Sequence, residues 1–226
     1  LFKKIDKALK IIKKLQMKSP IKTTNILLLV LVSMCSKNYG QELLKVAVAG
    51  LSHDHAHVIM NEWKQKKVIV LGIAEADKNL IKRYQKDYGL PDSLFYGDVK
   101  TMLHHVKPDA VLAYNPISEH LNVAEVCLPL KIPLVVEKPL AINTEQARRM
   151  AQLATENKTL LLTNFETTWY GSNQTLKDKV SMEGFGKIKK MVAKDGHEGP
   201  REIGCSEEFL AWLTDPEKNG GGALID

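Results

Sequence analysis

The sequence predicts an α/β fold, in which a doubly wound parallel sheet is followed by the start of a second α/β unit. Three observations predict it. Short apolar runs alternate with helical patterns over residues 45–163, most of these runs are nearly continuous, and the first of them ends in a glycine turn at Gly50. Continuous apolar strands are typical of a parallel sheet that helices cover on both faces. The right-handed crossover rule then favours the doubly wound arrangement.

The strands and helices of this first unit alternate regularly. We expect strands at residues 45–50, 68–75, 109–114, 132–137 and 159–163, and helices at residues 55–66, 77–88, 99–105, 118–130 and 144–156. Asp77, Asp98 and Asn143 each precede a helix, and their side chains can accept the free amide protons of its first turn. Pro116 has no amide proton to donate to a ladder and therefore marks the end of a strand.

The pattern changes after about residue 165. Residues 174–182 are expected to be helical, residues 184–186 to form a turn and residues 187–194 to form a strand. The chain stops at Asp226, after a glycine turn and the beginning of an apolar pattern. We therefore expect one domain over residues 44–165 and an incomplete second domain over residues 166–226, in a fragment of a longer protein.

Residues 1–41 are interpreted as a leader. Lysines crowd residues 1–22, the apolar run 25–35 follows, and a polar run leads to Gln41. A basic start, a short apolar core and a small residue are typical of a secretory signal, and the apolar run is shorter than the ~20 residues of a membrane helix. We expect export to the periplasm or the extracellular space, with Met17 as the true start and no stable membrane span after signal removal.

The leader also accounts for the net charge of +6. Residues 1–22 hold eight lysines and one aspartate, which leaves 24 basic and 25 acidic side chains in the rest of the chain. A nearly neutral body does not favour nucleic acid as a partner.

The amino-terminal segment and the cysteines leave alternatives open. Residues 1–16 also fit a basic amphipathic helix, and Cys35 could accept a lipid anchor. Without the leader the chain keeps Cys127 and Cys205, which need not pair in a domain of this size. We expect Cys127 in the core because it lies on an apolar helix face.

The loop Gly50-Leu51-Ser52-His53-Asp54-His55 lies where a dinucleotide fingerprint G-x-G-x-x-G would follow the first strand. Gly50 matches the first glycine, whereas Ser52 and His55 replace the other two. Ser52 is small enough for a pyrophosphate to approach the backbone, and the amides that open the next helix would face the phosphates. Histidines such as His53 would then lie solvated near a phosphate. An ordinary strand–helix turn is the alternative.

The histidines of this loop also suggest a metal. His53 and His57 are four residues apart and could share a helix face, as zinc ligands do. No second cluster of acids and histidines has an obvious ligand spacing, so we expect no metal site.

Two further strand ends supply candidate cofactor-binding residues. Glu75 follows Gly50 by about 25 residues, where an acid can accept both ribose hydroxyls of an adenosine, which favours NAD over NADP. Asn115, Pro116 and His120 follow a later strand, and their side chains would lie near the ribose or the nicotinamide. The alternatives are helix caps, formed by the acid at Glu75 and by Ser118 in the later segment.

The motif Glu137-Lys138-Pro139 ends a buried strand. A lysine at such a position is costly unless it is used or paired. Lys138 could bond to a substrate oxygen and assist proton transfer while a hydride moves. Glu137 could pair with this lysine or contact the nicotinamide ribose. A surface salt bridge is the structural alternative.

The ordered set of motifs resembles the Gfo/Idh/MocA family of NAD(P)-dependent oxidoreductases. The resemblance covers about residues 45–226 and rests on Val46 to Gly50, Glu75, Pro116 with His120, Glu137-Lys138-Pro139 and Gly220 to Asp226. It implies an N-terminal Rossmann domain and a C-terminal α/β domain whose open antiparallel sheet often mediates homo-oligomerisation. It also implies NAD as cofactor, with NADP less favoured, and a carbohydrate or polyol substrate.

The resemblance assigns roles to individual residues. Lys138 matches the catalytic lysine of the family, and Asp226 matches the acid that opens its Asp-x-x-x-His motif, whose histidine would lie beyond this chain. Trp169 and Tyr170 would lie at the domain junction, where aromatic faces suit a sugar ring or pack the seam between the domains. His197 is a further candidate for the border of the pocket, with a solvent loop as its alternative.

These observations predict an exported NAD-dependent oxidoreductase that acts on a sugar or polyol derivative. Two alternatives remain open. One is a glycoside hydrolase that uses bound NAD for transient oxidation. The other is a non-catalytic protein that binds a dinucleotide or a sugar.

Overall fold

The structure is a computed structural model that describes residues 42–192, 194, 196 and 198–221. The leader, Cys35, His197 and Asp226 therefore lie outside the described residues. The chain from Leu43 onward forms one compact unit. Within the described ranges, none of the helices combines the length and the apolar character that crossing a membrane requires.

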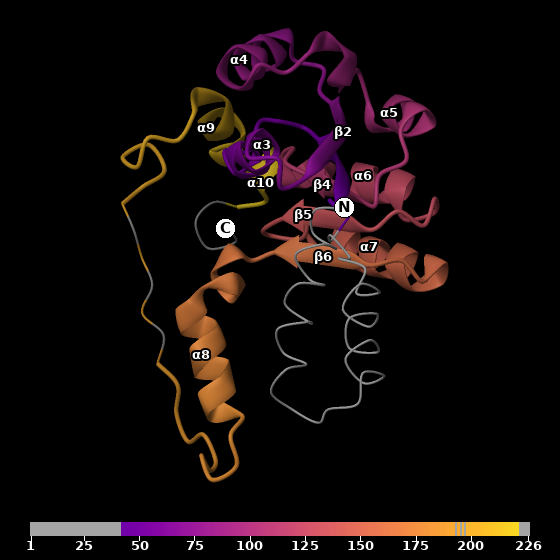
Figure 1. The fold of residues 1–226 in the computed structure, drawn as a ribbon. Coiled ribbons are helices and arrows are strands. Elements are labelled where there is room, and N and C mark those ends of the chain that lie inside the picture. Colours follow the sequence, from indigo (N-terminus) through magenta and orange to yellow (C-terminus); the bar gives the residue numbers. More distant parts are fainter. Residues whose placement is uncertain (1–41, 193, 195, 197, 222–226) are drawn as a thin grey trace, which may run out of the picture. The chain divides into compact units, whose positions relative to one another are not determined.

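A parallel sheet of six strands forms the centre of this unit (Figure 1). Five of these strands are predicted from the sequence, whereas the two-residue strand Phe95–Tyr96 is too short to give a recognisable pattern. The strands are β1 (Lys45–Ala49), β2 (Ile69–Ala74), β3 (Phe95–Tyr96), β4 (Ala110–Ala113), β5 (Leu134–Glu137) and β6 (Leu161–Asn164). Their order is β3-β2-β1-β4-β5-β6, and each neighbouring pair is parallel. The chain thus runs from β1 to one edge and returns to β4, so that the order reverses between β1 and β4.

Helices cover both faces of the sheet. They are α3 (Ala56–Lys64), α4 (Lys78–Tyr88), α5 (Val99–His105), α6 (His120–Cys127) and α7 (Thr144–Asn157). Alternate residues of β1 serve the two faces, as the period of a strand requires. Val48 shares a core with Met60 of α3, whereas Ala47 shares the opposite core with Met102 of α5 and Met150 of α7. The doubly wound α/β arrangement is confirmed.

The predicted helix caps form. Asp77 accepts hydrogen bonds from the first-turn amides of α4, Asp98 accepts one from Thr101, and Asn143 accepts one from Gln146. Each bond satisfies a backbone donor that has no partner within its helix. These local patterns therefore place the starts of three helices correctly.

The part of the chain after β6 is mainly helical. It contains the short 3₁₀ helix η3 (Glu166–Trp169) and the α-helices α8 (Gly171–Val180), α9 (Glu207–Leu213) and α10 (Pro216–Asn219). The strand predicted at residues 187–194 is wrong for the residues described there, which are 187–192 and 194. Ile188 and Met191 are exposed, and a strand needs a neighbour with which to exchange hydrogen bonds. An antiparallel sheet is not among the described residues of this region.

Met150 tests the assignment of the core beneath α7. Its side chain is fully buried, so Met150→Ala should lower the free energy of unfolding in urea by about 2–5 kcal/mol, because it leaves a cavity. The matched variant Met182→Ala removes a side chain that is 65% exposed and should change this quantity by less than about 0.5 kcal/mol. Comparable losses in the two variants would contradict this core.

Candidate functional site

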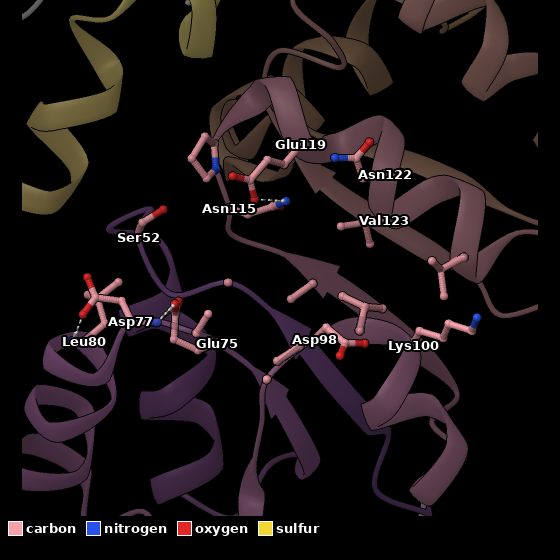
Figure 2. Close-up of a pocket in the computed structure, with 18 residues that line it drawn as sticks. Ser52, Glu75, Asp77, Leu80, Asp98, Lys100, Asn115, Glu119, Asn122 and Val123 are labelled. Atoms are coloured by element: carbon pink, nitrogen blue, oxygen red, sulfur yellow. Dashed lines mark hydrogen bonds between the residues drawn. The ribbon is translucent and has the colours of Figure 1, made fainter.

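A cavity of about 530 Å³ lies at the carboxyl ends of β1, β2 and β4 (Figure 2). It occupies the point where the strand order reverses, which is where open α/β sheets bind their ligands. Its volume falls within the range of small-molecule and cofactor sites. The polar and charged residues that line it are Ser52, Glu75, Asp77, Asp98, Lys100, Asn115, Glu119 and Asn122.

Gly50 allows the loop after β1 to touch the loop after β4. Its φ is 79°, and a Cβ atom added there would lie 2.6 Å from the Cβ of Asn115. The two loops are also hydrogen-bonded, because the amide of His53 donates to the carbonyl oxygen of Tyr114 over 2.9 Å. Only glycine combines this backbone conformation with so close an approach.

Two residues of the cavity lining, Ser52 and Asn115, carry buried polar atoms. The Ser52 hydroxyl and the Asn115 Oδ1 have no hydrogen-bond partner among the described residues, although the Asn115 Nδ2 donates to Glu119 over 3.2 Å. Buried polar atoms are normally paired with protein, water or a ligand. A serine hydroxyl can bond to a phosphate, and an amide oxygen can accept from a ribose hydroxyl. The residues present therefore fit a dinucleotide.

Glu75 closes one end of the cavity. Its Oε2 accepts from the Leu51 amide over 2.9 Å and its Oε1 from the Asp77 amide over 2.8 Å, so this acid holds the fingerprint loop as well as facing the cavity. Burial raises the pKa of Glu75 against the effect of these bonds. Asp77 and Asp98 also line the cavity, and Figure 2 shows Glu75 and Asp77 side by side.

Several predicted site residues lie elsewhere. The cavity lining includes Gly50, Ser52, Glu75, Asn115 and Pro116, but it does not include His53, His120, Glu137 or Lys138. The buried His120 pairs through Nδ1 with the carbonyl oxygen of Leu140 over 3.1 Å, and burial lowers its pKa. Lys138 is half-buried. Trp169, the last residue of η3, and Tyr170, which follows it, are exposed.

Sequence reasoning missed other residues of the cavity. The sequence assigns Asp98 only a capping role, which it has, but this acid also faces the cavity. Glu119 and Asn122 come from the segment that opens α6. Glu119 and Asn122 lie in the helical segment that follows β4, and a polar helix start after a buried strand was the signal that could have identified them.

A second cluster lies around Glu137. Its Oε2 is 3.0 Å from the Nδ1 of His55 and 3.9 Å from the Nε2 of His53, while its Oε1 accepts from the Asn164 amide group over 2.8 Å. His57 lies apart from this cluster, because it stacks on Tyr84 with ring centroids 4.9 Å apart.

The protonation of this cluster follows from its burial and its hydrogen bonds. Burial lowers the pKa of His53 to about 4, whereas the hydrogen bond to Glu137 raises the pKa of His55. Burial works to raise the pKa of Glu137, but the hydrogen bond from His55 and the nearby histidines outweigh it, so that this pKa is lowered. The contact between His55 and Glu137 thus favours the charged form of each group, whereas burial favours a neutral His53.

Helix α9 fastens the loop that carries these histidines. The Ser206 amide and hydroxyl donate to the carboxylate of Asp54 over 2.8 and 2.5 Å. The Trp212 indole donates to the carbonyl oxygen of Ser52 over 3.3 Å.

The chain is similar to several known proteins. Residues 44–165 match the model of an oxidoreductase family with an NAD-binding Rossmann fold. The chain is 29% identical over 183 residues to the D-glucoside 3-dehydrogenase of Escherichia coli (strain K12), and this alignment covers 81% of this chain and 50% of that protein. It is 24% identical over 159 residues to the trans-1,2-dihydrobenzene-1,2-diol dehydrogenase of Xenopus tropicalis, and this alignment covers 70% of this chain and 44% of that protein. The chain thus spans about half the length of these curated relatives.

Solved structures show the same fold. The myo-inositol 2-dehydrogenase of Lactobacillus plantarum superposes with a TM-score of 0.56 and 19% identity, over 65% of this chain and 43% of that one. The scyllo-inositol dehydrogenase of Lactobacillus casei, solved with NAD(H) and scyllo-inositol, superposes with a TM-score of 0.54 and 19% identity, over 62% and 41% of the two chains.

The contact between the two loops can be tested at Gly50. Gly50 and Gly184 both have a positive φ, of 79° and 88°, so a change to alanine should destabilise either position by about 1–2 kcal/mol. Only at Gly50 does the new Cβ overlap neighbouring atoms, which should add about 1–3 kcal/mol. Urea unfolding of Gly50→Ala and Gly184→Ala measures the difference, and equal losses would argue against the contact.

Proposed function

We propose that this chain, which belongs to the Gfo/Idh/MocA oxidoreductase family, binds NAD and is part of an enzyme that transfers a hydride to or from a sugar or polyol derivative. The observation that carries this proposal is the cavity at the carboxyl ends of β1, β2 and β4. Its lining combines the close approach at Gly50 with buried polar atoms of Ser52 and Asn115 that have no hydrogen-bond partner in the described part of the chain.

Different residues of the cavity would bind the pyrophosphate and the ribose groups of the cofactor. The Ser52 hydroxyl and the amides that open α3 would bind the pyrophosphate, and Asn115 would bond to a ribose. Glu75 would accept the hydroxyls of the adenosine ribose. When bound, NAD accepts or supplies the hydride. The acids Asp77 and Asp98, which also line the cavity, would repel a 2′-phosphate, which favours NAD over NADP.

Lys138 is proposed as the catalytic residue. It follows directly after β5, which pairs with β4, and the preceding Glu137 contacts His55 of the loop after β1. An ammonium group there can donate a hydrogen bond to the substrate oxygen and support the transfer of its proton. The name of the bacterial relative, a D-glucoside 3-dehydrogenase, supports a glycoside or a cyclic polyol as the substrate. The exposed aromatic faces of Trp169 and Tyr170 suit such a ring.

The relatives are longer than this chain, and we infer that the additional length completes the enzyme. It would supply the proton acceptor after Asp226 and the open antiparallel sheet through which family members often form oligomers. His197 would border the completed pocket. We also propose that the protein is exported, because residues 1–41 have the sequence pattern of a secretory signal.

Cofactor preference tests the role of the acids. In isothermal titration calorimetry NAD should bind at least about tenfold more tightly than NADP, a difference of about 1.4 kcal/mol. Glu75→Gln removes the charge at similar size and should shift this ratio toward NADP by about tenfold. Glu145→Gln, an exposed residue on α7, should leave the ratio unchanged. Equal affinity for both cofactors in the unaltered chain would refute the proposed selectivity.

Turnover tests the role of Lys138. In a protein that joins this chain to the remaining length of its relatives, Lys138→Ala should lower kcat by about 10²–10⁴-fold, the usual contribution of a proton-transfer group. The Kd for NAD should change by less than about threefold. Lys82→Ala, at an exposed position of α4, serves as the control. Unchanged turnover in Lys138→Ala would remove the lysine from the mechanism.

A further inference from the structure

We propose that His53, His55 and Glu137 form a binding site for a divalent transition-metal ion of the zinc class. None of the three residues lines the dinucleotide cavity, and the proposed function does not require a metal ion there. One ligand atom from each of the three side chains lies within 4.8 Å of the other two. Two imidazoles and one carboxylate are a donor set that zinc, iron and nickel bind well in proteins.

The distances are close to those of a metal centre. The Glu137 Oε2 is 3.0 Å from the His55 Nδ1 and 3.9 Å from the His53 Nε2. Tetrahedral zinc with bonds of about 2.0–2.1 Å places neighbouring ligand atoms roughly 3.3 Å apart. Small side-chain movements would therefore bring all three atoms to bonding distance of one ion.

The Nε2 of His53 is an independent indication of a ligand. The side chain is only 2% exposed, and this nitrogen has no hydrogen-bond partner among the described residues. Native proteins rarely leave such an atom unpaired, and where they do, a bound water or ion often satisfies it. A metal ion between His53 and Glu137 would satisfy this nitrogen and balance the buried carboxylate.

Coordination through this nitrogen requires one local exchange. The Nδ1 of His53 accepts a hydrogen bond of 3.1 Å from the His55 amide, so the neutral ring carries its proton on Nε2. Metal binding would move that proton to Nδ1, break the hydrogen bond from the His55 amide and form a metal–nitrogen bond. Coordination by the Nδ1 of His55 would also release to solvent the proton that this nitrogen shares with Glu137. The two hydrogen bonds that are lost cost little beside the metal–ligand bonds that are gained.

Neighbouring side chains already orient the ligands. The Asn164 amide group donates to the Glu137 Oε1 over 2.8 Å, which leaves Oε2 facing the histidines. The Phe209 ring meets the His53 ring edge-on, with centroids 4.6 Å apart. Such outer contacts fix the ligands of natural metal sites and are commonly needed for affinity.

The bound ion would link two separate parts of the sheet. His53 and His55 belong to the loop after β1, whereas Glu137 is the last residue of β5. Three protein ligands leave a coordination position for water or another small ligand. The ion would also fix the strand end that directly precedes Lys138.

Zinc binding by the untagged chain tests the proposal. After the chain is stripped with a chelator and dialysed, calorimetric titration with zinc chloride at neutral pH should show one equivalent bound, and elemental analysis should agree. His53→Gln and Glu137→Gln should each weaken binding by at least tenfold. His57→Gln is the matched control, because this imidazole lies on the same segment but stacks on Tyr84, and it should bind zinc like the unaltered chain.

A second measurement does not depend on variants. Cobalt(II) added to the unaltered chain should give the visible absorption bands of a four- or five-coordinate nitrogen and oxygen site, and one equivalent of zinc should remove them. The proposal is overturned if the unaltered chain binds neither ion, or if Glu137→Gln binds zinc as tightly as His57→Gln does. NAD affinity, measured in parallel, reports on the dinucleotide cavity separately.

Discussion

The contact between Gly50 and Asn115 is the constraint on which the cavity depends. A side chain at Gly50 would overlap the Cβ and backbone of Asn115, so the loops after β1 and β4 can meet only through a glycine. Their meeting places the Ser52 hydroxyl and the Asn115 amide oxygen in one wall. Glu75 connects the end of β2 to the same loop, because its carboxylate accepts a hydrogen bond from the Leu51 amide. Three strand ends thus share one hydrogen-bonded surface.

The third position of the fingerprint shows how the fold accommodates a departure from glycine. A glycine there normally lets the helix pack closely on the strand. In this chain His55 precedes the first turn of α3 with helical backbone angles, and its ring reaches Glu137. The following residue, Ala56, is fully buried. A small side chain therefore still lies next to this position, while the imidazole projects toward β5.

The sequence predicts well whatever depends on neighbouring residues. Strand and helix alternation, the caps at Asp77, Asp98 and Asn143, and the chain reversal at Gly50 are all local patterns. The pairing of His55 with Glu137 joins residues 82 positions apart and depends on the strand order, which the pattern of a single segment does not contain. The spacing of His53 and His57 suggested one helix face, yet the chain only enters the helix at Ala56, so that His57 faces α4 instead.

The attachment of α9 has a consequence for biosynthesis. Ser206 and Trp212 hold Asp54 and Ser52 across 152 and 160 residues of sequence. Contacts over such separations form late, and chains emerge from the ribosome amino-terminal end first. All six strands are therefore synthesised before α9, and the sheet can assemble on the ribosome before the loop at residues 50–55 gains its contacts with that helix.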